Sequence, residues 1–153
     1  MTEAVSTTEL QLVVFDLAGE HYGVDIANVR EIIQMQAVTC IPGSAAFVKG
    51  MINLRGVVIP VIDLRQRFGF PEADNDKDTR IIVISTEKQD IGMIVDSVTE
   101  VLRIPADSIE PTSSVLSNDN TGYLRGTAKL PDRLVILLDV KALLGGEELA
   151  GLS

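Results

Sequence analysis

The chain contains an internal repeat, and this repeat constrains the fold more than any single motif. When the sequence is shifted by 69 residues, the apolar run 12–15 (LVVF) falls on 81–84 (IIVI); after a seven-residue insertion the shift becomes 76. The matched pairs include Gly23 and Gly92, Val29 and Val98, Glu31 and Glu100, Gly50 and Gly126, Asp63 and Asp139, and Gly69 and Gly145. Coincident Gly, Asp and Glu at fixed positions are harder to obtain by chance than similar aliphatic strands. We therefore expect two copies of one small unit.

Each copy is predicted to be mostly β. Short runs rich in Val, Ile and Leu alternate with turn residues, and the expected strands are 10–18, 21–26, 35–41, 50–52, 57–62, 80–86, 91–95, 122–130 and 133–138. Two segments, 25–34 and 96–102, have apolar residues at helical spacing, although their β-branched residues would also suit a bent strand. Asp63 and Asp139 are expected to cap short helical turns.

The size of the repeat predicts how the copies are arranged. A unit of roughly 60–70 residues is marginally stable alone, because a small core buries little surface. Closing each copy into a barrel would remove exposed strand edges, and packing the barrels together would bury more apolar surface. We expect a flexible N-terminus over 1–9, a first barrel over 10–70, an acidic linker over 71–78, a second barrel over 79–146 and a tail over 147–153. Strands or helices exchanged between the barrels are compatible with the repeat, and a groove is expected where the barrels meet.

The composition narrows the class of protein. Hydrophobic residues make up 46% of the chain, but aromatic residues only 4% with no Trp, so the core must be aliphatic. A net charge of -9 argues against binding to a phosphate backbone. No apolar run reaches the ~18 residues of a membrane span, and MTEAVSTTEL lacks the features of a signal peptide, so we expect a cytoplasmic protein. The single cysteine, Cys40, excludes an internal disulfide, and its place beside Ile41 predicts a small buried hydrophobe.

No group of residues in the sequence predicts catalysis, a metal or another cofactor. The segment 74–78 (DNDKD) imitates the start of a calcium loop, but its sixth and twelfth positions are Thr79 and Ser85 in place of Gly and Glu. His21 is the only histidine, which excludes a histidine-based metal site. Gly145-Gly146 is expected to follow a helix, whereas a phosphate-binding glycine loop precedes one. We therefore expect neither an enzyme nor a cofactor.

Arg55 is the residue that the repeat does not explain. It lies in an Asn-Leu-Arg-Gly turn between two apolar strands, and the second copy has Pro131-Asp132 in place of Arg55-Gly56. One interpretation is a guanidinium presented to a partner or paired with Glu31, and the other is a solvated turn arginine. Glu31 has a twin in the second copy, so it fits equally well on the exposed side of an apolar stripe. The sequence favours a functional arginine and leaves the role of Glu31 open.

Three segments resemble the CheW family of bacterial chemotaxis adaptors: YGVDIANVREI at 22–32, FVKGMINLRGVVIPVIDLR at 47–65 and GMIVDSVTEVL at 92–102. The resemblance covers 10–144. It implies two five-stranded, SH3-like β-barrels around a shared hydrophobic core. It also implies a non-catalytic, cytoplasmic adaptor that couples the cytoplasmic tips of membrane chemoreceptors to the histidine kinase CheA, at receptor arrays of the inner membrane.

The resemblance also implies site residues. The receptor-binding and signalling positions are Val29, Glu31, Gly50 and Arg55 in the first copy and Val98 in the second. The loop at Val115 and Leu116 resembles a region that contacts the kinase or a neighbouring adaptor, although Val115 is smaller than the residue that some relatives have there. Two other hypotheses stay open at this point. The chain could serve a pilus-motility or similar chemosensory pathway, or it could be a β-barrel module that binds a small ligand between its barrels.

Overall fold

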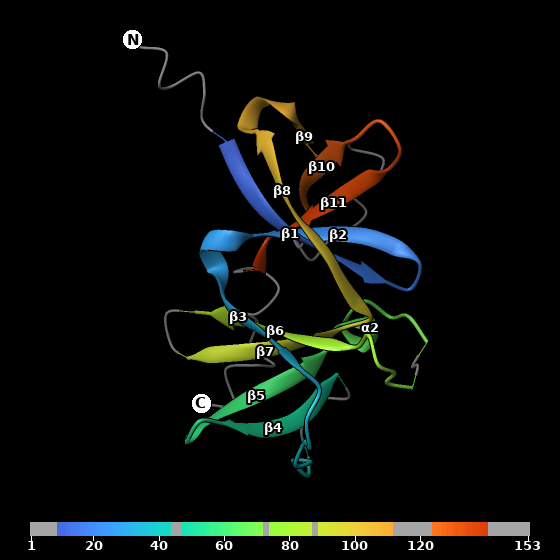
Figure 1. The fold of residues 1–153 in the computed structure, drawn as a ribbon. Helices are drawn as coiled ribbons and strands as arrows, with labels where there is room; N and C mark the ends of the chain where they lie inside the picture. The colour runs from blue at the N-terminus through green and yellow to red at the C-terminus, as the bar shows by residue number, and fades with distance from the viewer. Residues whose placement is uncertain (1–8, 44–46, 72–73, 87–88, 112–123, 141–153) are drawn as a thin grey trace.

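The computed structural model describes residues 9–43, 47–71, 74–86, 89–111 and 124–140. This part of the chain is mostly β and forms two sheets, one above the other in Figure 1. The upper sheet has the order β8 (Ser97–Pro105), β1 (Glu9–Leu17), β2 (Glu20–Asp25), β11 (Leu134–Leu138), β10 (Leu124–Lys129) and β9 (Ile109–Pro111). The lower sheet has the order β3 (Val29–Gln34), β6 (Arg80–Ser85), β7 (Asp90–Val95), β5 (Val57–Asp63) and β4 (Val48–Leu54). We call these sheets the upper barrel and the lower barrel.

Each barrel is built from both sequence copies. β1 and β2, from the first copy, pair with β8 and β11 of the second copy, while β6 and β7 of the second copy pair with β3 and β5 of the first. The registers are equivalent: Val13 pairs with Val101 and Ile82 with Ile32, and each pair becomes the other under the shift of 69. The leading hairpin of each copy is therefore exchanged, and the boundary at 71–78 does not separate the two sheets.

Three cores result from the period-two alternation of the strands. In β1, Leu12 and Val14 point into the upper barrel, whereas Val13 and Phe15 belong to a core shared by both barrels. The shared core takes buried residues from both sheets, namely Val13, Phe15, Leu17, Tyr22, Val24, Val48, Ile62, Leu64, Ile82, Ile84, Ile91, Met93, Val95, Leu138 and Val140. Because strands such as β1 and β6 are buried on both faces, their sequences are continuously apolar instead of alternating.

Short helical turns join the strands. η1 (Ile26–Asn28) is capped by Asp25, whose Oδ1 accepts a hydrogen bond from the Ala27 N–H at 2.9 Å. α2 (Leu64–Arg67) is capped by Asp63, which accepts from the Arg65 N–H at 3.1 Å, as the sequence predicts. A third turn, η2 (Ala106–Ser108), precedes β9. Most of the turn expected after Asp139 lies outside the described residues.

The helical interpretation of 25–34 and 96–102 was wrong, and the bent-strand alternative holds. Apart from η1, these segments form β3 and most of β8, because each finds a neighbouring strand to pair with and its β-branched residues suit a pleated surface. The strand expected at 35–41 is reduced to a bridge between Thr39 and Met51. Cys40, expected to be buried, is exposed, whereas Met35 and Val38 of the same segment pack against the core of the lower barrel.

Candidate interaction site

Arg55 lies at the tip of the β4–β5 hairpin. Arg55 and Gly56 are the two central residues of the turn, and both have positive φ, +53° and +88°. Two central residues with positive φ define a type I′ turn, which matches the twist of the flanking strands. The Gly56 N–H donates to the Asn53 Oδ1 at 2.8 Å and fixes the turn. An arginine in the left-handed region is uncommon, because its Cβ crowds the backbone there.

The guanidinium of Arg55 is paired with Glu31 on β3. Arg55 Nη2 donates to Glu31 Oε2, and this side-chain contact joins β3 to the β4–β5 hairpin at the other end of the lower sheet. Glu31 is on the less exposed side of β3, together with Val29 and Ile33, and not on the exposed side. The glutamate side chain is 26% exposed and the arginine 68%. Glu31 therefore holds one edge of a guanidinium that otherwise faces solvent.

The upper barrel has an equivalent pair that the sequence alignment does not reveal. Glu100, the twin of Glu31, pairs with Arg133, which follows the β10–β11 turn two positions after the residue aligned with Arg55. Here the arginine side chain is only 26% exposed and the glutamate 35%. The second copy therefore does have an arginine paired with this glutamate, and the prediction that it lacks one is wrong. The copies differ in exposure and not in the presence of an arginine.

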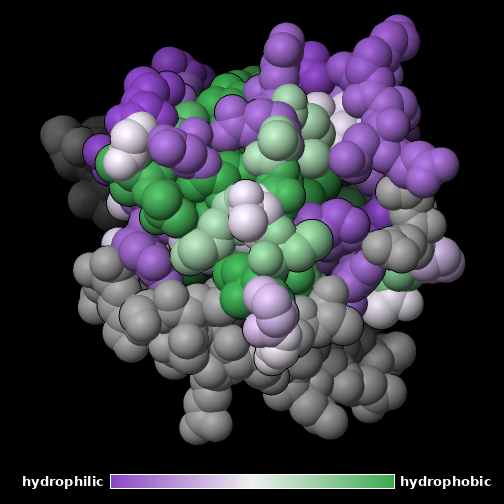
Figure 2. Space-filling model, turned by 90° about the horizontal axis from the view of Figure 1, so that it is seen from below, coloured by the Kyte–Doolittle hydropathy of each residue, from purple (hydrophilic) through white to green (hydrophobic). Residues whose placement is uncertain are grey.

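Exposed aliphatic residues accompany both pairs. Val57 and Val58, directly after the Arg55 turn, are 59% and 57% exposed. Ile32 is exposed on the face of β3 opposite Glu31, and its twin Val101 is exposed on the face of β8 opposite Glu100. In Figure 2, which looks at the molecule from the side of the lower barrel, apolar surface gathers in the middle of the face with hydrophilic residues around part of it. Apolar side chains beside an oriented charge are typical of a protein-binding surface.

Val29 and Val98 lie at equivalent places on the two barrels. Val29 pairs with Ile84 and Val98 with Phe15, each beside a register shift in its strand pair. Both valines are partly buried and pack against the shared core. The structure thus brings these two predicted residues to the junction between the barrels, while Arg55 occupies a hairpin tip.

Gly50 has a structural explanation. It is buried with φ +148°, and a Cβ there would lie 2.1 Å from the carbonyl oxygen of Thr39. Its twin Gly126 is also tightly packed, with a Cβ position 2.6 Å from the Glu110 oxygen. Both glycines let a neighbouring segment close its barrel. Val115 and Leu116 lie outside the described residues.

The described residues contain no cluster of three or more His, Cys, Asp and Glu side chains that could hold a metal ion. Within the same part of the chain, no helix is long and apolar enough to cross a membrane. His21 pairs with Asp16 through Nδ1 and Oδ1 at 2.6 Å. In these residues, the fold and the site define a double-barrel module with a surface suited to protein binding.

Known proteins give the family. The CheW-like domain matches residues 11–148, which is most of the chain. The chain is 38% identical to the chemotaxis protein CheW of Klebsiella aerogenes, over 96% of this chain and 89% of that protein. It is 35% identical to CheW of Bacillus subtilis, over 96% and 94%. The chain therefore belongs to the CheW-like family, which confirms the resemblance seen in the sequence.

A solved structure shows the same fold. The crystal structure of the scaffolding protein CheW from Thermoanaerobacter tengcongensis superposes with a TM-score of 0.82 at 39% identity, covering 92% of this chain and 96% of that one. This likeness confirms the mostly β fold of two pseudo-repeated, barrel-like sheets.

Proposed function

We propose that this chain is a non-catalytic chemotaxis adaptor that couples the cytoplasmic tips of chemoreceptors to the histidine kinase CheA. Its family supports a role in chemotaxis, and the scaffolding protein of the same fold supports a role in assembly. The observation that carries the proposal is the exposed Arg55, which Glu31 orients beside Val57 and Val58. We place the protein in the cytoplasm, where the receptor tips and the kinase are found.

The receptor contact is proposed at the barrel junction and the adjoining end of the lower barrel. Val29 and Val98 would supply aliphatic contacts to an amphipathic receptor helix. Arg55 would bind a carboxylate or carbonyl of the partner with the donors that Glu31 does not occupy. We propose that Gly50 acts indirectly, by allowing the close approach of Thr39 to β4.

The kinase contact is proposed in the second copy. Val115 and Leu116, which come between β9 and β10 in the sequence, are the proposed contacts with CheA or with a neighbouring adaptor in a ring. This assignment rests on the family resemblance of the loop. The partner surface would be apolar, since both side chains are aliphatic.

Co-sedimentation tests the adaptor function. Membranes that contain receptors are mixed with CheA and either the wild-type chain or Arg55→Ala, and the pelleted kinase is measured. We expect the wild type to recruit CheA and Arg55→Ala to recruit less, with an affinity for receptor membranes about tenfold lower, the usual scale for losing a charge-assisted contact. Absence of recruitment by the wild type would contradict the proposed function.

The matched control is Arg103→Ala. Arg103 is also an exposed arginine, but it lies on β8 of the upper barrel. We expect this variant to recruit CheA as the wild type does, because it removes the same charge elsewhere on the surface. Equal losses for both variants would show that net charge, and not the Arg55 site, controls recruitment.

A further inference from the structure

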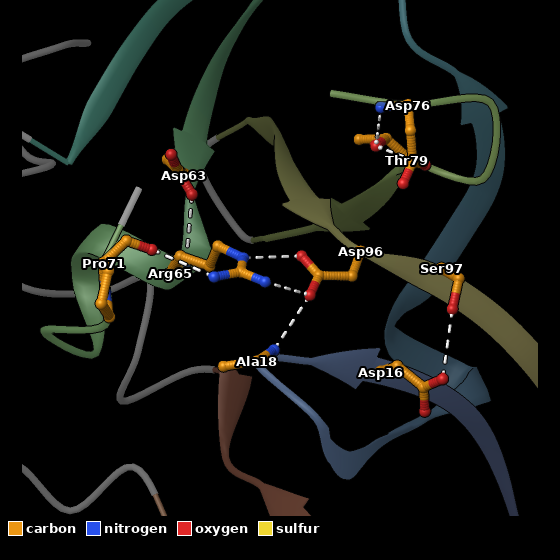
Figure 3. Close-up of polar contacts among 9 residues, drawn as sticks. All are labelled: Asp16, Ala18, Asp63, Arg65, Pro71, Asp76, Thr79, Asp96 and Ser97. Carbon is orange, nitrogen blue, oxygen red and sulfur yellow. Dashed lines mark hydrogen bonds and ion pairs between the residues drawn. The ribbon is translucent and has the colours of Figure 1, made fainter. Parts of the chain in front are cut away.

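A polar cluster lies where the chain crosses from the lower barrel to the upper one (Figure 3). β7 ends at Val95 and β8 begins at Ser97, so Asp96 is the crossing residue. Its carboxylate accepts a two-pronged contact from Arg65, with Nε to Oδ1 at 2.8 Å and Nη2 to Oδ2 at 2.6 Å. Oδ2 also accepts the Ala18 N–H at 2.9 Å. We call Arg65, Asp96 and Ala18 the crossing clamp.

The crossing clamp joins segments of both barrels. Arg65 belongs to α2, which directly follows β5 of the lower barrel, and its Nη1 also donates to the Pro71 oxygen at 3.1 Å. Ala18 lies in the turn between β1 and β2 of the upper barrel. The Asp96 N–H donates to the backbone carbonyl oxygen of Asp16 at 3.1 Å, which connects the crossing residue to β1 as well. Asp96 thus joins the crossing to α2 of the lower barrel and to β1 and the β1–β2 turn of the upper barrel.

Asp96 and Arg65 of the crossing clamp are both charged at neutral pH. Burial raises the pKa of Asp96, but the hydrogen bonds from Arg65 and from the Ala18 N–H outweigh burial and hold that pKa below its usual value. The hydrogen bond to Asp96 raises the pKa of Arg65. Both partners are therefore charged, and a two-pronged arginine–carboxylate contact fixes orientation as well as distance.

The clamp adjoins a residue that we place in the partner contact. Ser97 Oγ donates to Asp16 Oδ2 at 3.3 Å. Val98 comes next, paired with Phe15 beside the register shift between β1 and β8 and packed against the shared core. The crossing clamp thus fixes the first residues of β8, which precede the register shift and the regular pairing of β8 with β1. Any movement of Asp96 would shift Val98 relative to α2.

The equivalent crossing in the first copy is built differently. There β2 passes into β3 through η1, and Ala27 occupies the position that corresponds to Asp96 under the shift of 69. An alanine side chain cannot accept a hydrogen bond, so the ionic contact at Asp96 has no counterpart at this position. The first-copy crossing therefore uses the Asp25 cap on the Ala27 N–H in place of an arginine–carboxylate contact.

We propose that Arg65 and Asp96 are positioning residues. They hold Val98, the proposed receptor-contact residue of the upper barrel, in a fixed position relative to the lower barrel. This inference rests on the proposed function. The two residues act through the backbone of β8 and do not touch the partner. The shared apolar core holds the barrels together, and the clamp sets the local geometry at their junction.

Binding and hydrogen exchange together test the proposal. The variants are Asp96→Asn, which keeps the shape but removes the charge, and Arg65→Lys, which keeps the charge but removes the fork. The dissociation constant for a soluble receptor fragment is measured, and the exchange of the Ala18 and Val98 amide protons is followed by NMR. For Asp96→Asn we expect roughly tenfold weaker binding and faster exchange at both amides, with cooperative unfolding retained. For Arg65→Lys we expect binding and amide exchange between those of Asp96→Asn and the wild type. The lysine ammonium keeps the charge but cannot make the two parallel hydrogen bonds of a guanidinium.

Asp90→Asn is the control. Asp90 also lies on β7 and pairs with Arg30 at 3.2 Å, but it is at the opposite end of the strand from the crossing. We expect its binding and the Val98 exchange to match the wild type. Unchanged exchange at Ala18 and Val98 in Asp96→Asn, or equal binding losses in Asp96→Asn and Asp90→Asn, would overturn the positioning role. If the wild type does not bind receptor, the proposed function fails, while exchange at the crossing still decides whether the clamp fixes β8.

Discussion

The two barrels have equivalent strand arrangements and each contains an arginine–glutamate pair, but the two arginines differ in exposure. In the lower barrel Arg55 enters from the tip of a type I′ turn and is 68% exposed, whereas in the upper barrel Arg133 enters after the turn and is 26% exposed. In both, the carboxylate comes from the equivalent position of β3 or β8. A shift of two residues along a hairpin therefore separates a mostly buried arginine from one that is mostly exposed to solvent.

The largest expected effect is at the paired glycines. Gly50→Ala should lower the free energy of unfolding by about 3 kcal/mol or more, because its Cβ would overlap the Thr39 carbonyl and the backbone has positive φ. Gly126→Ala should cost less, since its φ is ordinary for any residue and its contact is longer. Urea denaturation followed by circular dichroism measures both.

Gly56→Ala is the control for this pair. Gly56 also has positive φ, but nothing lies within 4 Å of its Cβ position. We expect a loss of about 1 kcal/mol, from backbone strain alone. If Gly50→Ala costs no more than Gly56→Ala, the close approach of Thr39 is not what requires a glycine.

Alanine substitution of the two paired arginines should lower the free energy of unfolding by different amounts. Arg133→Ala should cost about 2 kcal/mol, because it removes a mostly buried arginine side chain together with its contact to Glu100. Arg55→Ala should cost ~0–1 kcal/mol, as for exposed pairs. Urea unfolding of both variants, each beside Arg103→Ala, gives the comparison. Equal losses would mean that exposure does not distinguish the two sites.

The last expected effect, at the crossing, is small and depends on pH. The pKa of Asp96 is lower in the folded chain than the ordinary value of about 4 in the unfolded one. Its stabilisation is therefore complete above that ordinary value and is lost as the pH falls through the folded pKa. We expect Asp96→Asn to cost about 1 kcal/mol at pH 7 and progressively less in acid. Urea unfolding of both proteins from pH 7 down to about pH 3 measures this difference. A difference that stays constant with pH would show that the carboxylate is not held in its charged form by Arg65.

Features that depend on neighbours in sequence could be predicted. The glycine and aspartate matches revealed the repeat, the hairpin at Arg55-Gly56 followed from its flanking strands, and Asp63 caps α2 as expected. The segment 25–34 was misassigned because Val29, Ile32 and Ile33 fit a helical stripe, whereas strand pairing with β6 places Ile32 outside and the other two inside. Periodicity alone does not distinguish these cases for short β-branched runs.

The sequence by itself determined the family, the duplicated β architecture and the residues worth testing, because these are written in local patterns and their recurrence. Only the tertiary structure decided that the leading hairpins are exchanged between barrels, that Arg133 meets Glu100, and that Arg65 meets Asp96 at the crossing. Both ion pairs join residues more than 30 positions apart in the sequence. In addition, Arg133 is two positions away from the residue that aligns with Arg55. Such contacts depend on how strands pack together, and local sequence patterns do not specify that packing.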